Sequence, residues 1–112
     1  EANIAASKET VALLERLFQT VQKSAHSALQ ALVSADERAA QAVVASRDEI
    51  LALTADLHRQ QAARLAQDDP DRLLKHRVQL EIIDKLRRIY SVAEHMAISV
   101  LPRSALVGAL SV

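Results

Sequence analysis

Apolar residues in the first third of the chain recur at alternating steps of three and four. The main stripe consists of Val11, Leu14, Phe18, Val21, Ala25, Ala28 and Leu32. These steps place the stripe on one face of an α-helix, which has about 3.6 residues per turn. Leu13, Leu17 and Leu29 widen the stripe, as in a helix that packs against two neighbours. The pattern predicts a helix over about residues 4–33 that belongs to a bundle.

A second helix is predicted over about residues 35–67. Ser34 and Glu37 have the spacing of a capping box, in which each side chain bonds the backbone N–H of the other residue. The apolar positions that follow, with no Gly or Pro among them, are Val43, Val44, Ile50, Leu53, Leu57 and Leu65. Asp69-Pro70 then indicates a stop and a restart, because the residue before Pro avoids the helical region while Pro itself suits a first helical position.

The third helix is predicted over about residues 70–101 and ends at Pro102. Its stripe consists of Val78, Ile82, Leu86, Ile89, Ala93, Met96 and Val100. Three helices of similar length with short connections must run up, down and up. We therefore expect an all-α fold, with one antiparallel three-helix bundle over residues 1–102. The apolar tail, 103–112, could pack loosely, exchange with a neighbour or be disordered.

Composition supports one helical domain and narrows its partners. The 112 residues suffice for one core, and a single Gly with two Pro favours helices over turns. Fourteen basic residues balance fourteen acidic ones, so no net field draws the chain to nucleic acid. No apolar run approaches the roughly 20 residues that span a bilayer, and we expect the fragment itself to be soluble. Because the chain begins at Glu1 without Met, its parent protein could still be longer and membrane-bound.

The sequence carries no recognisable catalytic constellation. The four histidines are His26, His58, His76 and His95, and none of them stands three residues after a Glu, as the di-metal carboxylate bundles require. A His-Glu-x-x-His helix, a Gly-rich phosphate loop and a nucleophile elbow are also missing from the sequence. We therefore predict no enzyme activity, no catalytic residue, no cofactor and no metal. Solvated or helix-end histidines are favoured over a shared histidine site.

A basic run on the third helix is the remaining candidate for binding. Arg87 and Arg88, with Lys85 nearby, could contact phosphate or an acidic partner. The same side chains could instead pair with acidic residues on their own or neighbouring helices, and we favour this structural interpretation.

The third helix also resembles a known family. Residues 80–96, with the sequence LEIIDKLRRIYSVAEHM, are followed by Val100-Leu101-Pro102. This string resembles the last helix of a PhoU-like domain, and in particular the soluble domain that follows the membrane region of bacterial sodium/phosphate cotransporters. The resemblance extends over residues 5–102 and implies the same three-helix fold.

The resemblance also bears on metal binding. Metal-binding PhoU proteins hold iron-like cations with acidic residues spaced four apart on the second and third helices. The matching positions here are Leu51 on the second helix and Arg87 and Ser91 on the third. A hard cation needs carboxylate oxygens, and Arg87 would put a positive charge where the metal would sit. We therefore expect the multinuclear metal site of the family to be absent.

The resemblance implies a non-catalytic regulatory domain of a sodium-dependent phosphate transporter, and we expect it at the cytoplasmic face of the inner membrane. Its partner would be the membrane portion of the same parent chain or another transport protein. The alternatives are a free-standing PhoU-like regulator of phosphate uptake and a metal-binding or dimerising helical module.

A homodimer is a further possibility, because PhoU proteins usually contain two such bundles in tandem and this chain has one. The candidate interface residues are Leu13, Leu17, Ile83, Arg87 and Tyr90. The apolar ones could instead belong to a wide internal core.

Overall fold

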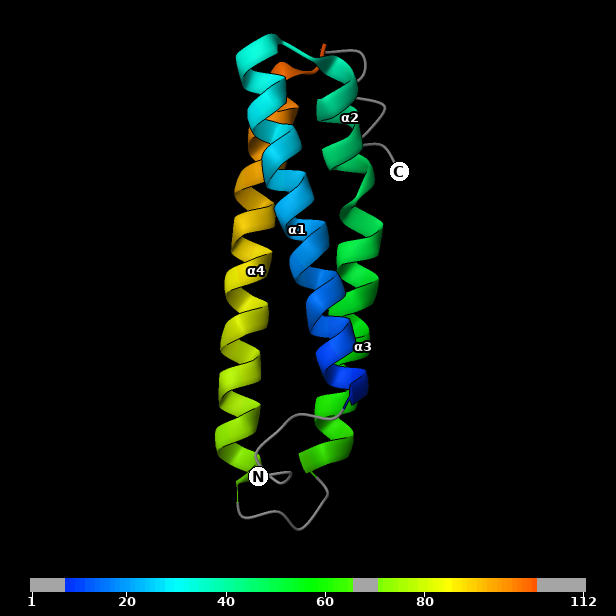
Figure 1. The fold of residues 1–112 in the computed structure, drawn as a ribbon, viewed down its shortest axis with the longest axis vertical. Helices are drawn as coiled ribbons and strands as arrows, with labels where there is room; N and C mark the ends of the chain where they lie inside the picture. The colour runs from blue at the N-terminus through cyan, green and yellow to red at the C-terminus, as the bar shows by residue number, and fades with distance from the viewer. Residues whose placement is uncertain (1–7, 66–70, 103–112) are drawn as a thin grey trace.

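The computed structural model describes residues 8–65 and 71–102 of the chain. Its helices are α1 (Lys8–Ser34), α2 (Glu37–Ala45), α3 (Arg47–Leu65) and α4 (Arg72–Val100). In Figure 1, α1 rises, α2 and α3 descend as one rod that is broken between them, and α4 rises again. The molecule is elongated, with extents of 52 × 26 × 18 Å. The predicted all-α, up-down-up bundle of three rods is confirmed.

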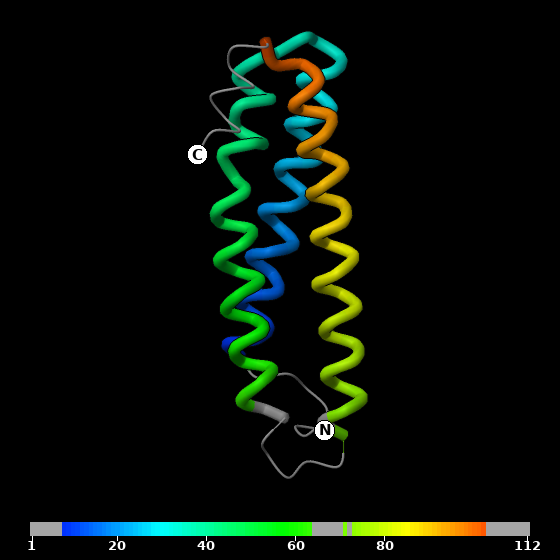
Figure 2. Tube along the Cα trace, turned by 180° about the vertical axis from the view of Figure 1, so that it is seen from behind, coloured from blue at the N-terminus to red at the C-terminus, as the bar shows by residue number. Residues whose placement is uncertain are grey.

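From behind, α4 lies beside the second rod, and its last turns lie next to α2 (Figure 2). None of the helices in the described part of the chain is both long and apolar enough to cross a membrane.

The turn between the first two rods differs from the predicted capping box. Ala35 has a φ of 52°, and the Asp36 N–H donates to the Ala31 carbonyl over 3.2 Å, which is a Schellman arrangement that ends α1 at Ser34. The Asp36 side chain then accepts from the backbone N–H groups of Arg38 at 3.0 Å and Ala39 at 3.2 Å. The prediction that Ser34 caps the second rod is wrong, because the left-handed turn leaves Asp36 as the residue with the extended backbone that a cap requires.

The second rod is broken at Ser46, whereas the sequence predicted one helix through this point. The Ser46 hydroxyl donates to the Ala42 carbonyl over 3.0 Å, and its backbone N–H bonds the Val43 carbonyl over 3.1 Å. Such back-bonding by Ser bends helices without any Gly or Pro. The Ile50 N–H donates to the Ser46 carbonyl at 3.0 Å, so α3 begins immediately.

The C-terminal end of α4 agrees with the prediction, whereas part of its predicted start is untested. Asp71 occupies the N-cap position of α4. The predicted cap Asp69 and the predicted first residue Pro70 lie outside the described residues, as does the tail 103–112. At the other end Leu101 is extended, with a ψ of 145°, as the residue before Pro102 must be.

The core coincides only in part with the predicted stripes. The main buried apolar residues are Leu17, Val21, Ala28 and Ala31 on α1, Val43 on α2, Ile50, Leu53 and Leu57 on α3, and Ile83, Leu86, Tyr90, Ala93 and Ala97 on α4. Six stripe residues predicted to be core are instead 41% to 51% exposed, namely Val11, Phe18, Leu32, Val78, Ile82 and Ile89. The apolar arcs of α1 and α4 are each wider than the neighbouring helices cover. One edge of each arc is therefore buried in the core, and the rest of the arc is exposed.

The observed burial also bears on the predicted partner interface. Leu17, Ile83 and Tyr90 are 0%, 2% and 5% exposed, so they belong to the chain's own core and are not available at the bundle surface. Leu13 is half-buried against that core, and Arg87 is exposed. The burial of the apolar interface candidates therefore agrees with the alternative that they belong to a wide internal core.

Candidate functional site

A small hollow between the second rod and α4 brings together the three residues that the resemblance placed at metal positions. Its volume is about 180 Å³. It is lined by Arg47, Ile50, Leu51, Arg87, Tyr90, Ser91 and Glu94. Leu51 comes from α3, while Arg87 and Ser91 are four residues apart on α4, which places them on one face of that helix.

The charges in this hollow disfavour a cation. Glu94 supplies the only carboxylate among its lining residues, and its Oε2 accepts from Arg47 Nε at 2.7 Å and from Arg47 Nη2 at 2.6 Å. The Glu94 side chain is 13% exposed and therefore partly desolvated. The guanidinium of Arg47 neutralises its charge in this position. Arg87 adds a second positive charge, and no other described residue forms an ion pair with it.

The described residues therefore offer no ligand set for a metal. No group of three or more His, Asp or Glu side chains among residues 8–65 and 71–102 could hold a metal ion. That the whole protein binds no metal remains a prediction.

Tyr90 joins α4 to the end of α2 at the inner wall of the same hollow. Its hydroxyl donates to the Val43 carbonyl over 2.6 Å, and both groups are buried. Burial raises the pKa of the Tyr90 hydroxyl well above its ordinary value, and the negative charge of Glu94 adds to the rise. Because the carbonyl belongs to the last turn of α2, this bond ties α4 to the break at Ser46.

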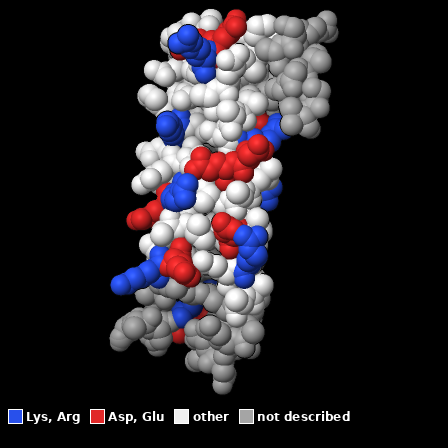
Figure 3. Space-filling view, turned by 90° about the vertical axis from the view of Figure 1, so that its right-hand side faces the viewer, with Lys and Arg blue, Asp and Glu red and all other residues white. Residues whose placement is uncertain are grey.

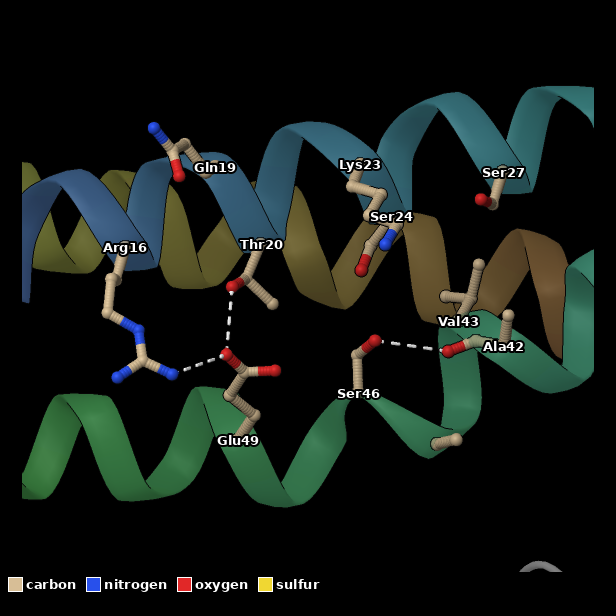
Figure 4. Close-up of a pocket in the computed structure, with 11 residues that line it drawn as sticks. Arg16, Gln19, Thr20, Lys23, Ser24, Ser27, Ala42, Val43, Ser46 and Glu49 are labelled. Atoms are coloured by element: carbon tan, nitrogen blue, oxygen red, sulfur yellow. Dashed lines mark hydrogen bonds and ion pairs between the residues drawn. The ribbon is translucent and has the colours of Figure 1, made fainter.

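A larger polar hollow lies on the other side of the break, between α1 and the second rod (Figure 4). Its volume is about 500 Å³. It is lined by Arg16, Gln19, Thr20, Lys23, Ser24, Ser27, Ala42, Val43, Ala45, Ser46 and Glu49. Glu49 Oε2 accepts from Arg16 Nη2 at 3.4 Å and from Thr20 Oγ1 at 3.3 Å, so α1 and α3 are joined across its mouth.

This hollow was not found from the sequence. The only signal is the small size of facing residues, such as Ser24 and Ser27 on α1 and Ala42 and Ala45 on α2, which keeps the two helices from filling the space between them. Hydroxyl groups line it, but none of its lining residues is His or Cys, and its one carboxylate is already bonded by two donors. The site can accommodate a polar group but has no base placed to activate a hydroxyl nucleophile.

The histidines do not share a site in the described part of the chain. His26, His58 and His95 are exposed, in line with the favoured interpretation of solvated residues. His76 is half-buried, and its Nδ1 is buried without a hydrogen-bond partner among the described residues.

The basic run on α4 is divided between two roles. Arg88 Nε lies 3.3 Å from Asp84 Oδ2, four residues earlier, so it forms the helix-surface pair that the structural interpretation predicts. Lys85 and Arg87 are exposed, and Arg87 lines the small hollow. Within the run, Arg88 is therefore paired on its own helix, whereas Arg87 lines the small hollow.

Comparison with known proteins identifies one family. The model of the PhoU domain matches residues 14–100, which include most of α1 and the whole of α2, α3 and α4. Neither a curated protein nor a solved structure matches the chain significantly.

Proposed function

Because this chain belongs to the PhoU domain family, we propose that it is a regulatory domain that acts in phosphate transport through contacts with protein partners. The observation that carries the proposal is the family match over residues 14–100. The family indicates a role in regulating phosphate transport, and we propose in addition that the domain acts through contacts with protein partners.

The geometry supports action by helix contacts. The small hollow contains two arginines and one already paired carboxylate, which suits an acidic or polar group of a partner better than a cation. Acidic and basic side chains are interspersed on the outward side of α2 and α3 (Figure 3). Such a face has no patch of one sign to hold nucleic acid, and a protein partner is the better fit.

We further propose that the parent is a sodium-dependent phosphate transporter, with this domain at the cytoplasmic face of the inner membrane. The support is the resemblance of residues 80–96 to the helix that ends such domains. The domain would act on the membrane portion of the same chain or on another transport protein.

The test is sodium-dependent uptake of radioactive phosphate in cells that lack their own uptake systems and express the parent gene. We expect full-length parent to transport phosphate, and Arg87→Glu to change the rate because it reverses a charge in the small hollow. Arg77→Glu is the matched control, since Arg77 is an exposed residue of α4 outside that hollow.

A parent gene without segments of about 20 apolar residues would contradict the transporter assignment and favour a free-standing regulator. In that case a phosphate-responsive reporter in a deletion strain would replace the uptake assay. If Arg87→Glu changed neither phosphate uptake nor the reporter signal, this result would contradict the regulatory role itself.

A further inference from the structure

The polar hollow between α1 and the second rod contains hydroxyl groups that the chain itself does not use. Thr20, Ser24 and Ser27 are spaced four and three apart, so they form one row along α1, and all three line the hollow. The Thr20 hydroxyl donates to Glu49 at 3.3 Å, but within the described residues neither Ser24 nor Ser27 has a hydrogen-bond partner. Ser24 is only 3% exposed, so its hydroxyl is largely removed from bulk water. A donor in such a position is stabilised when an acceptor enters the hollow.

Lys23 adds a positive charge beside this row. The side chains of Lys23 and Ser24 extend from α1 toward the second rod (Figure 4). No acidic residue in the described part of the chain forms an ion pair with Lys23. The charged lining residues are Arg16, Lys23 and Glu49, two cations and one carboxylate, which leaves a net charge of one positive unit. Because Arg16 and Glu49 pair with each other, the uncompensated charge is that of Lys23.

The start of α3 adjoins the same hollow. Ser46 and Glu49 line it, and α3 begins between them at Arg47. Backbone N–H groups in the first turn of a helix have no acceptor within that helix and carry a partial positive charge. A 19-residue helix therefore favours an anion at this end. The carboxylate of Glu49 offsets part of this charge, but it is already bonded by two donors from α1.

We propose that the polar hollow binds a phosphate group, carried by inorganic phosphate or by a small polar phosphate ester. A phosphate group has three strong acceptor oxygens. Lys23, Ser24 and Ser27 supply an ammonium group and two hydroxyls, none of which has another partner in the described part of the chain. The net positive charge of the lining opposes a metal cation and favours an anion.

The size and composition of the hollow limit the rest of the ligand. Its volume of about 500 Å³ lies within the range of small-molecule sites and leaves room for a few polar atoms beside the phosphate group. None of its lining residues is aromatic, so it has no ring on which a nucleobase could stack. A short polyol ester therefore fits better than a nucleotide.

The inference does not depend on the proposed role in phosphate transport, because it concerns binding by the chain alone. The uptake assay can fail without affecting the binding measurement, and binding can be absent in a domain that still regulates transport.

The test is isothermal titration calorimetry of residues 1–112 with inorganic phosphate and, separately, with glycerol 3-phosphate, at constant ionic strength. We expect one phosphate group per chain with a Kd of about 1 mM, because the hollow is open and Lys23 is exposed. Lys23→Gln should weaken binding about tenfold and Ser24→Ala about fivefold, since each removes one donor to a charged group.

Lys85→Gln is the matched control, because Lys85 is an exposed lysine of α4 outside the hollow, and its affinity should equal that of the wild type. Circular dichroism would establish that the variants are folded. Lys23→Gln keeps the proposal testable if Ser24→Ala does not fold, because an exposed side chain can be replaced without disturbing the core.

A second measurement locates the ligand directly. In the ¹⁵N-labelled chain, we expect phosphate to shift the backbone amide signals of Ser24, Ser27 and Arg47 and to leave that of Lys85 unchanged. Shifts confined to residues outside the polar hollow would overturn the choice of site.

The relative affinities of the two ligands identify the source of the phosphate group. Tighter binding of glycerol 3-phosphate would support an ester, tighter binding of inorganic phosphate would support the free ion, and equal affinities would show that the phosphate group alone is recognised. No saturable binding of either ligand up to about 10 mM, ten times the expected Kd, would overturn the proposal. Equal weakening by Lys23→Gln and Lys85→Gln would do the same, as would binding of glycerol as tightly as its phosphate.

Discussion

Replacement of Tyr90 by Phe tests how α4 is joined to the break in the second rod. The change removes the hydroxyl that donates to the Val43 carbonyl over 2.6 Å and keeps the ring in the core. The carbonyl retains the bond from the Ser46 N–H at 3.1 Å, so it is not left without a donor. The loss should therefore be that of one net hydrogen bond.

We expect Tyr90→Phe to lower the free energy of unfolding by about 1 kcal/mol at neutral pH, which is typical of one buried neutral hydrogen bond. For a domain of this size the melting temperature should fall by about 4 °C. Tyr90→Ala should cost about 3–5 kcal/mol, because it also leaves a cavity in the core. Urea unfolding followed by circular dichroism measures all three proteins, at one fixed protein concentration so that self-association affects them equally.

The pH dependence provides an independent check on the same bond. Burial, with a contribution from Glu94, raises the pKa of the Tyr90 hydroxyl in the folded chain. In the unfolded chain the hydroxyl loses its proton near its ordinary pKa of about 10. Above that pH the folded state binds more protons than the unfolded state, so the contribution of Tyr90 falls as pH rises, by up to about 1.4 kcal/mol per pH unit.

The advantage of wild type over Tyr90→Phe should therefore vanish about one pH unit above 10. Lysine titration affects both proteins and cancels in the comparison. A gap that stays constant between pH 8 and pH 11 would refute the argument from burial. A loss above about 3 kcal/mol for Tyr90→Phe at neutral pH would show that the hydroxyl holds more than this one bond.

Asp36→Ala should cost about 1 kcal/mol of stability and Ser34→Ala less than about 0.5 kcal/mol, because Asp36 is the residue that caps α2; equal losses in thermal melts would contradict that assignment. Ala35→Gly should raise the stability by about 0.5–1 kcal/mol, because it relieves a left-handed backbone, and an unchanged or lower melting temperature would count against this. Leu17→Ala should cost about 2–5 kcal/mol in urea unfolding, whereas Leu51→Ala, at a half-exposed position, should cost about 1 kcal/mol or less; the reverse order would mean that the core lies elsewhere. Metal analysis of the purified chain should find no stoichiometric iron, zinc or manganese, and one bound ion per chain would contradict the loss of the family's metal site.

The small hollow is occupied by contacts between helices, and its described side chains do not form a metal-ligand set. Leu51, Arg87 and Ser91 meet there, and the carboxylate of Glu94 is bonded by Arg47. The ion pair between Arg47 and Glu94 joins α3 to α4, so a protein contact spans the two helices at this point. In this chain the described side chains of the hollow therefore hold α3 and α4 together.

The sequence by itself determined the number of rods, their order and the end of the last one. Steps of three and four are produced only by helical spacing, short connections force antiparallel neighbours, and Pro102 cannot continue a helix. The string at residues 80–96 also led to the family that the comparison identifies. The spacing that relates Arg87 to Ser91 is likewise local, because residues four apart share a face on any helix.

Tertiary structure alone decided which part of each apolar arc is buried, where the second rod is capped and where it breaks. Periodicity defines an arc but not the neighbour that covers it, so Phe18 and Leu17 are adjacent in the same apolar region and differ by 51% against 0% exposure. The cap moved to Asp36 because the left-handed turn at Ala35 occupies the residue before it. Leu51 meets Arg87 and Ser91 only because the rods are antiparallel and packed in one register, which depends on contacts between residues far apart in the chain.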